Sequence, residues 1–253
     1  MTRQVELKTE NKIARIILNN PNKHNAFNEV IIDDFLDILN KLKNDTTIKV
    51  IILEAVGKSF CAGADLEWMQ KMVNFTREEN YNDSLKLAEV FHLLYNLPQV
   101  TIAKIQGAAY GGGVGLVACC DIAIASGNAN FCFSEVKLGL MPAVISPYVL
   151  KAIGLKQAKR YFVTAEIISS KKALDINLVN EIVNENELEN FVDDMAQNIM
   201  MNCGYAIRRA KKLLNNIANK EIDQNLIELT ANEISNLRVS EKAQARLKKF
   251  LVK

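Results

Sequence analysis

The sequence has few of the residues that define the simplest special classes of protein. Its 253 residues include only 4 prolines, 11 glycines and 2 histidines. So little proline and glycine excludes a collagen-like or low-complexity chain. The cysteines number 5 and form no C-x-x-C pair, so the sequence supports neither a disulfide framework nor a zinc site. We therefore expect no bound metal.

The chain also lacks an excess of charge of either sign. Lysine and arginine total 31 and aspartate and glutamate total 29, which gives a net charge of +2. A value so close to zero argues against a nucleic acid or a membrane surface as a partner. Residues 1–10 carry several charges and no apolar stretch, so neither a signal peptide nor a transit peptide is expected. The cytoplasm is the expected location.

No hydrophobic run is long enough to cross a membrane. The longest uncharged stretch, residues 105–120, has 16 residues and contains Gln106 and five glycines. A membrane-spanning helix needs about 20 mostly apolar residues. The stretch instead predicts a buried strand, a tight turn and the start of a packed helix.

What the sequence does contain is typical of a globular α/β protein. Hydrophobic residues make up 49% of the chain and charged residues 24%, which is enough for a sizeable core. The length fits one large domain, or a domain with a helical appendage. Residues 5–10 and 13–18 predict a β-hairpin around Asn11 and Lys12. The next expected elements are an amphipathic helix over 28–42 and strands over 49–56, 100–105, 122–125 and 131–133.

The alternation of strands and helices predicts a layered α/β domain. From residue 169 onward the sequence is expected to be mostly helical, with helices over 187–201, 204–218, 225–237 and 240–251. We divide the chain into an α/β core, residues 1–200, and a helical C-terminal region, residues 201–253. The apolar side chains of Ile207, Leu214 and Ile217 suggest that this region is a lid or an assembly element.

Two turns of small residues follow directly after buried strands. They are Cys61 to Asp65 and Gly107 to Gly115. Small residues let a ligand approach backbone N–H groups, and a turn that opens a helix favours an oxygen anion. Two such donors directed at one point would form an oxyanion hole. The alternative is that the glycines only allow close packing of a helix against a strand.

Glu135 is the carboxylate with the most unusual surroundings. It follows the apolar segment Phe131 to Phe133 and precedes Val136 and Leu138. A carboxyl group in such surroundings tends to have a raised pKa, which suits general acid or base catalysis near neutral pH. The alternative is a solvated strand end at which Glu135 pairs with Lys137.

Four motifs occur in order along the chain. They are Asn20-Pro21-x-Lys23-x-Asn25-Ala26-Phe27, then Phe60-Cys61-Ala62-Gly63-Ala64-Asp65-Leu66, then Gln106-Gly107-Ala108-Ala109-x-Gly111-Gly112-Gly113, and then Phe133-Ser134-Glu135-x-x-x-Gly139-Leu140-x-Pro142. Together they resemble the successive signatures of the crotonase (enoyl-CoA hydratase/isomerase) superfamily. The resemblance covers nearly the whole chain.

This resemblance implies a fold, a substrate class and a set of site residues. The fold would be a crotonase-type spiral of ββα units with a helical C-terminal region, assembled as a homotrimer or hexamer. The substrate would be an acyl-CoA thioester, so coenzyme A is part of the substrate and no separate cofactor is expected. By position, the backbone N–H groups of Ala64 and Gly112 match the family's oxyanion hole, and Glu135 matches a catalytic acid/base. The implied substrate-binding residues are Lys23, His24, Ala26, Ala62, Asp65, Leu66, Gly111 and Pro142.

The sequence departs from the family pattern at one catalytic position. Hydratases of the family usually carry two glutamates, and here the first position is Gly115 while Glu135 remains. Together with the segment Ala143 to Tyr148, this resembles bacterial methylglutaconyl-CoA and related branched enoyl-CoA hydratases. We expect hydration of a branched or methylglutaconyl-type thioester. The alternatives are an enoyl-CoA isomerase with a single glutamate, or a non-catalytic protein that binds CoA.

Overall fold

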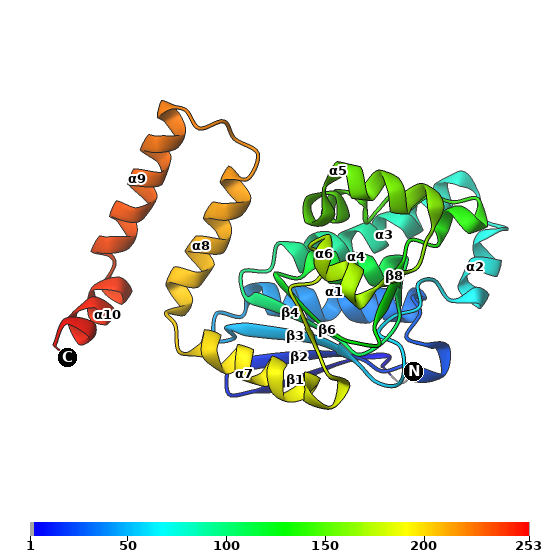
Figure 1. Ribbon diagram of the computed structural model, residues 1–253, viewed down its shortest axis with the longest axis horizontal. Helices are drawn as coiled ribbons and strands as arrows, with labels where there is room; N and C mark the ends of the chain where they lie inside the picture. Colours follow the sequence, from blue (N-terminus) through cyan, green and yellow to red (C-terminus); the bar gives the residue numbers. More distant parts are fainter. Residues whose placement is uncertain (1–2, 253) are drawn as a thin grey trace. The chain divides into compact units, whose positions relative to one another are not determined.

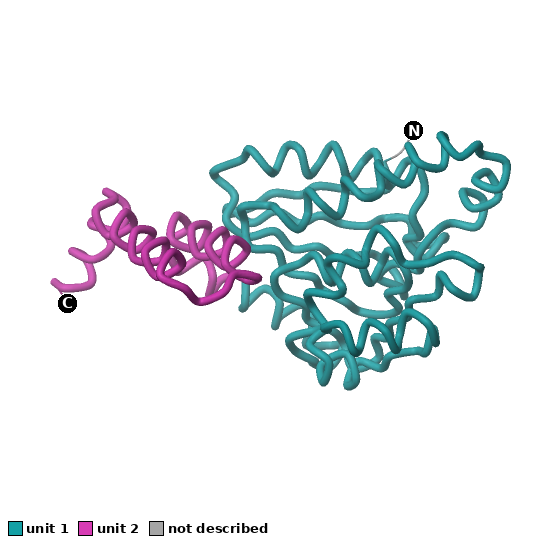
Figure 2. The backbone as a smooth tube through the Cα atoms, turned by 90° about the horizontal axis from the view of Figure 1, so that it is seen from above, with its two compact units in different colours: residues 1–196 teal, residues 197–253 magenta. Residues whose placement is uncertain are grey.

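The computed structural model describes residues 3–252, and the chain divides into two compact units, one up to Ala196 and the other from Gln197 (Figure 2). The boundary falls inside helix α7 (Leu188–Met200), a few residues before the expected division at 200/201. The first unit contains all the strands. The second is helical.

The first unit begins with the predicted hairpin. Strand β1 (Val5–Glu10) pairs antiparallel with β2 (Ile13–Leu18). The two residues between them, Asn11 and Lys12, have φ angles of 50° and 68°. A tight two-residue turn of this kind requires positive φ at both positions. The hairpin prediction is therefore confirmed, turn included.

The main sheet has six strands in the order β1-β2-β3-β4-β6-β9 (Figure 1). From β2 onward all neighbours are parallel: β3 (Val50–Ala55), β4 (Val100–Ile105), β6 (Ile122–Ser126) and β9 (Glu181–Val183). Parallel neighbours need crossover connections, which α1 (Glu29–Asn44), α3 (Arg77–Tyr95) and α4 (Gly112–Cys119) provide.

A second, three-stranded sheet lies beside the first. Its order is β5 (Ala109–Tyr110), β7 (Asn130–Cys132) and β8 (Ile168–Ser169). Strand β9 was not predicted; it falls in the stretch from residue 169 onward, which is otherwise mostly helical as expected. With only three residues, β9 is too short for a hydrophobic period to identify it. The other elements of this unit are α2 (Leu66–Met72), α5 (Ser146–Thr164), α6 (Ser170–Asp175) and the short 3-10 helices Pro21–Lys23, Glu135–Leu138 and Glu185–Glu187.

Helix α1 covers one face of the main sheet through the apolar stripe predicted for it. Its N-terminus is capped by Asn28, whose side chain accepts a hydrogen bond from the N–H of Ile31 at 2.9 Å. Phe35, Ile38 and Leu39 are fully buried against the strands and α3. These residues form the centre of the hydrophobic core, so the sheet and its crossover helices give a rigid base for the loops at the strand ends.

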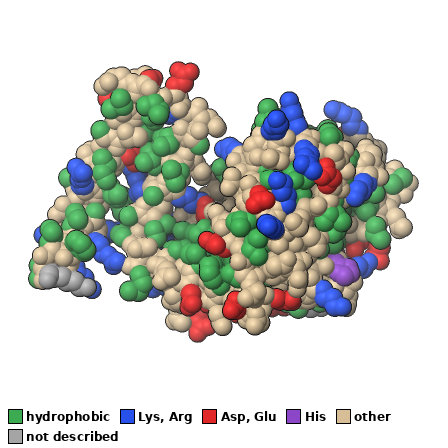
Figure 3. All heavy atoms as spheres, viewed as in Figure 1, with side chains coloured by type: hydrophobic (Ala, Val, Ile, Leu, Met, Phe, Trp, Pro, Cys, Tyr) green, Lys and Arg blue, Asp and Glu red, His purple; other side chains and the backbone are tan. Residues whose placement is uncertain are grey.

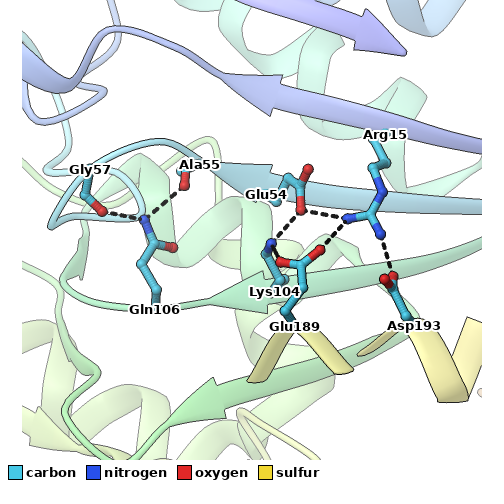
Figure 4. Close-up of polar contacts among 8 residues, drawn as sticks. All are labelled: Arg15, Glu54, Ala55, Gly57, Lys104, Gln106, Glu189 and Asp193. Atoms are coloured by element: carbon cyan, nitrogen blue, oxygen red, sulfur yellow. Dashed lines mark hydrogen bonds and ion pairs between the residues drawn. The ribbon is translucent and has the colours of Figure 1, made fainter. Parts of the chain in front are cut away.

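The opposite face of the sheet is joined to α7 by a network of ion pairs (Figure 4). Glu54 on β3 accepts from Arg15 on β2 at 2.8 Å and from Lys104 on β4 at 2.6 Å. From α7, Glu189 contacts both cations and Asp193 contacts Arg15. Arg15 alternates along β2 with the buried residues of the core face, so period-2 alternation explains why charge gathers on this face.

The second unit consists of helices close to those predicted: α8 (Gly204–Ile217), α9 (Gln224–Val239) and α10 (Glu241–Leu251). None of the three has a fully buried residue. Hydrophobic side chains reach the surface of this unit in the view of Figure 3. The exposed large hydrophobic residues of the second unit include Leu214, Ile227, Ile234, Val239, Phe250 and Leu251. Within residues 3–252, no helix is both long and apolar enough to cross a membrane.

Candidate active site

A cavity of about 770 Å³ lies where the two small-residue turns meet. Its walls are the Ala62 to Leu66 turn, residues of α2, one face of α3, the Gly111 to Gly112 turn and the segment Ser134 to Ile145. The two turns follow β3 and β4, which are neighbouring parallel strands. The carboxyl ends of neighbouring parallel strands lie at the same sheet edge, which is where α/β proteins usually bind ligands.

Backbone hydrogen bonds fix the two turns against each other. The N–H of Cys61 donates to the carbonyl of Ala108 at 3.1 Å, and the N–H of Tyr110 donates to the carbonyl of Cys61 at 2.8 Å. The side chain of Gln106 holds the preceding loop through the carbonyls of Ala55 and Gly57, each at 3.0 Å (Figure 4). Hydrogen bonds to main-chain carbonyl groups therefore hold the two turns in place.

Each turn presents a backbone N–H group that no acceptor within residues 3–252 uses. At the first turn, Phe27 donates to the carbonyl of Gly63 at 2.7 Å, and Asp65 donates to the carbonyl of Phe27 at 2.8 Å. Because successive N–H groups of an extended chain point to opposite sides, the N–H of Ala64 points away from Phe27. At the second turn, Gly112 is the first residue of α4, whose N–H has no partner inside the helix.

Ala64 and Gly112 both line the cavity. Two free N–H groups, one of them at a helix N-terminus, can stabilise negative charge that develops on an oxygen atom between them. The sequence analysis named both residues, and the structure brings them to the same cavity.

Glu135 lies in this cavity beside the second turn. Gly111 has φ +49°, and a methyl group there would lie 3.2 Å from Oε1 of Glu135. A residue with a side chain would therefore strain the turn and crowd the carboxylate. Oε2 of Glu135 is buried and has no hydrogen-bond partner within the described chain. Burial raises the pKa of Glu135 above its ordinary value, and the hydrogen bond from its own N–H opposes this only in part.

Glu135 is not a solvated strand end, because it is the first residue of the 3-10 helix Glu135–Leu138 and its Oε2 is buried. Lys137 makes no ion pair with it among the described residues, and the carboxylate is half-buried. A carboxyl group with a raised pKa and an unused oxygen can take a proton from a bound molecule and return it.

The site also shows why position 115 carries no side chain. A methyl group on Gly115 would lie 2.2 Å from Cγ2 of Ile145 and 2.9 Å from Cε1 of Phe91. Ile145 lies within the segment Ala143 to Tyr148, which departs from the family pattern. Ile145 and Phe91 are both buried, so apolar side chains fill the space beside Gly115, the position that was matched by resemblance to the family's first glutamate.

The predicted substrate-binding residues fall into two groups. Ala62, Leu66, Gly111 and Pro142 line the cavity directly. Lys23, His24, Ala26 and Asp65 are not among its lining residues. Ala26 and Asp65 are buried and directly adjoin the lining residues Phe27 and Ala64, whereas Lys23 and His24 are exposed.

These four residues make polar contacts outside the lining of the cavity. Asp65 caps α2 by accepting hydrogen bonds from the N–H groups of Glu67 at 2.8 Å and Trp68 at 3.2 Å, and its other oxygen lies 3.4 Å from the ammonium of Lys23. Burial alone would raise the pKa of Asp65, but these hydrogen bonds and Lys23 together lower it. Nδ1 of His24 lies 3.1 Å from the hydroxyl of Ser59, and the N–H of Ala26 donates to the carbonyl of Lys23.

One wall of the cavity was missed by the sequence analysis. Asn80, Asp83, Ser84 and Leu87 on α3 all face the cavity. They are spaced i, i+3, i+4 and i+7, which places them on one face of the helix. That spacing could have indicated the wall, but the stretch is mostly polar and resembles an ordinary solvated helix face.

The structure places no group of three or more His, Cys, Asp or Glu side chains where they could hold a metal ion, as far as residues 3–252 are concerned.

Comparison with known proteins identifies the family. The model of the enoyl-CoA hydratase/isomerase family matches residues 8–253. The chain belongs to this family. It is 34% identical to the short-chain-enoyl-CoA hydratase of Clostridium acetobutylicum over 221 residues, which cover 87% of this chain and 84% of that protein. It is 33% identical to the crotonyl-CoA hydratase of Syntrophomonas wolfei over 220 residues, which cover 86% of this chain and 84% of the relative.

Solved structures agree with this assignment and confirm the crotonase fold. A crotonase-family structure from Legionella pneumophila matches with a TM-score of 0.95 and 46% identity, covering 99% of this chain and 97% of the other. The enoyl-CoA hydratase of Shewanella pealeana matches with a TM-score of 0.94 and 39% identity, covering 98% and 93%. The sequence-based prediction of family and fold is therefore confirmed.

Within this family, the contact between positions 115 and 145 leads to a prediction about stability. Gly115→Ala is expected to lower the free energy of unfolding by about 1–3 kcal/mol, because the new methyl overlaps Ile145. Ile145→Ala alone should cost about 2–5 kcal/mol through the cavity it leaves. The double variant should lose clearly less stability than the two single variants together, because the methyl group added at position 115 occupies space that the shortened side chain at position 145 leaves. Urea unfolding of the four proteins measures this coupling, and additive losses would contradict the contact.

Proposed function

We propose that the protein is an enoyl-CoA hydratase, which adds water across the 2,3 double bond of an enoyl-CoA thioester. The observation that carries the proposal is the placement of the Glu135 carboxylate in the same cavity as the free N–H groups of Ala64 and Gly112. The hydratase names of the relatives from Clostridium acetobutylicum and Syntrophomonas wolfei support it.

In the proposed mechanism the thioester oxygen lies between the N–H groups of Ala64 and Gly112, which form the oxyanion hole. Glu135 takes a proton from a water molecule as the water oxygen bonds to C3 of the substrate. The electron pair of the double bond moves toward the thioester, and the N–H groups stabilise the enolate charge on its oxygen. Glu135 then gives its proton to C2, so one carboxylate serves as base and then as acid.

The acyl group is proposed to be branched and uncharged. The sequence led us to expect a branched or methylglutaconyl-type group, and a methylglutaconyl group ends in a second carboxylate. The cavity walls within residues 3–252 contain two carboxylates, Glu135 and Asp83, and no Lys, Arg or His. A distal carboxylate there would lose its hydration without gaining a cation, which is costly. The cavity therefore supports a branched acyl chain without that second charge.

A second candidate function is enoyl-CoA isomerisation. The observation that favours it is that the apolar side chains of Ile145 and Phe91 fill the space beside Gly115, because a reaction without water needs only one proton-transferring group. The experiment that separates the two functions supplies branched and straight 2-enoyl-CoA and 3-enoyl-CoA thioesters and identifies the products. A 3-hydroxyacyl product from the 2-enoyl substrates supports the hydratase. Double-bond migration alone supports the isomerase, and no turnover of any thioester supports a protein that only binds CoA.

The raised pKa of Glu135 predicts the pH dependence of the reaction. Water is deprotonated only when Glu135 is ionised, so kcat should fall as the pH is lowered through the pKa of Glu135. Because burial raises that pKa, the acidic limb should lie above the value of 4.5 that is ordinary for a glutamate. A profile of kcat against pH checks this. A limb at or below the ordinary value would contradict a buried base.

The second unit is proposed to assemble the protein into a homotrimer or hexamer. Its three helices expose Ile227, Ile234 and further apolar side chains, and exposed apolar patches of this kind usually mark interfaces. Replacing both Ile227 and Ile234 with Glu is expected to shift the sedimentation coefficient toward that of the monomer. Asn236→Glu adds charge to the same helix without removing an apolar group and is the control. A double variant with an unchanged sedimentation coefficient would contradict this role.

A further inference from the structure

The α3 wall of the cavity is rich in hydrogen-bond acceptors. Asn80, Asp83 and Ser84 face the cavity from one side of the helix, beside the apolar Leu87. The mechanism proposed above uses none of these three side chains. Polar groups in a largely apolar binding cavity usually fix the orientation of a ligand.

The side-chain oxygen of Asn80 is available to a ligand, whereas its side-chain nitrogen is not. Its side-chain nitrogen donates to the carbonyls of Phe75 and Thr76, each at 3.1 Å. Both of its donor hydrogens are thereby used by the main chain. The oxygen that remains can only accept a hydrogen bond.

Asp83 is the stronger acceptor and is poorly compensated. Among the described residues, its carboxylate accepts one hydrogen bond, from the indole N–H of Trp68 at 3.3 Å. The ammonium of Lys86 pairs with Asp33 on α1 at 3.1 Å. Burial raises the pKa of Asp83, more than Trp68 and Lys86 lower it, and Glu29 raises it further. The half-buried carboxylate therefore has capacity for another donor.

We infer that Asp83 is a specificity-determining residue that selects acyl chains with a hydroxyl group in their distal part and disfavours chains that end in a carboxylate. A hydroxyl can donate to Asp83 while the apolar residues Trp68 and Leu87 cover the rest of the chain. A carboxylate at the same place would meet a like charge in a partly dehydrated wall. The inference rests on the proposed function, because it takes the cavity to hold the acyl part of a CoA thioester.

The test uses saturated thioesters, which bind but cannot be hydrated. The probes are hexanoyl-CoA and octanoyl-CoA with their ω-hydroxy and ω-carboxy derivatives, and isothermal titration calorimetry gives the Kd of each. The intact wild-type protein is expected to bind an ω-hydroxy derivative at least about tenfold more tightly than the ω-carboxy derivative of the same length, which corresponds to about 1.4 kcal/mol.

Asp83→Asn is expected to tighten binding of the ω-carboxy derivative about fivefold or more, since the like charge is gone. Its Kd for the unsubstituted thioesters should stay within about twofold of the wild-type value. Asp83→Leu should in addition lose the preference for the hydroxyl. Asp37 lies on the exposed side of α1. The control Asp37→Asn removes a carboxylate that is outside the cavity, so it should change none of the Kd values.

Equal wild-type affinity for the ω-hydroxy and ω-carboxy derivatives at both lengths would overturn the inference, and so would Asp83→Asn with wild-type Kd values. A failure of the proposed function is distinguishable from this. If the affinities follow the expected pattern while no enoyl-CoA is hydrated, Asp83 selects the acyl chain and the hydratase assignment is wrong. If no thioester binds at all, both are wrong.

Discussion

Glu135→Gln is expected to lower kcat for enoyl-CoA hydration by a factor on the order of 10² to 10⁴, the usual contribution of a positioned proton-transfer group. Glutamine keeps the size of the side chain but can no longer take a proton from water. The unpaired Oε2 and the raised pKa of Glu135 both indicate that the fold gains little from this carboxylate, so the variant should remain folded. Steady-state kinetics and thermal unfolding of the same preparation measure both quantities.

The matched control is Glu89→Gln, on an exposed part of α3 outside the cavity walls. It should leave both kcat and the unfolding temperature unchanged. Near-normal turnover of the Glu135→Gln variant would remove Glu135 from the mechanism. An unfolded variant would show that the carboxylate is structural.

Ala64→Pro is expected to lower kcat by about 10² to 10³, because it deletes one of the two N–H groups proposed to hold the thioester oxygen. Proline lacks the N–H, and in this fold no protein acceptor within residues 3–252 uses the N–H of Ala64. The neighbouring hydrogen bonds, from Phe27 to Gly63 and from Asp65 to Phe27, can persist. Circular dichroism should therefore show a native fold.

Ala64→Gly is the control for this experiment, since it changes the side chain and retains the N–H. Its kcat should stay within about threefold of the wild-type value, because backbone donors remain in place. If the glycine variant loses as much activity as the proline variant, the side chain or the rigidity of the turn matters instead of the N–H. If neither loses activity, the oxyanion hole does not include Ala64.

Much of the fold could be predicted because local patterns and tertiary packing agree. Asn11 and Lys12 between two alternating segments indicated the β1–β2 hairpin, and the stripe around Phe35 and Leu39 indicated α1. Strand β9 could not be predicted, because three residues at a sheet edge carry no measurable period and their pairing with β6 is a long-range contact. In such segments the partner strand, rather than local propensity, decides the structure.

The parts of the candidate site that lie in sequence motifs could be predicted. The parts that depend on tertiary packing could not. Glu135, Ala64 and Gly112 each lie in a motif, and the structure gathers them around one cavity. Ile145 fills the space beside Gly115, although the two positions are 30 residues apart in the sequence. No pattern in either segment indicates this contact. The α3 wall was missed because a helix face that borders a cavity has the same polar composition as one that borders solvent.

The central claim is that Glu135 alone moves the proton in a hydration reaction, and one experiment in heavy water tests it most directly. The wild-type protein is incubated in heavy water with a branched 2-enoyl-CoA and, separately, with the corresponding 3-enoyl-CoA, and the products are analysed by mass spectrometry. The account predicts a 3-hydroxyacyl-CoA from the 2-enoyl substrate, with deuterium at C2 delivered by Glu135, and loss of this product in Glu135→Gln. Rapid migration of the double bond in the 3-enoyl substrate, with no 3-hydroxyacyl product from any 2-enoyl-CoA, would contradict it.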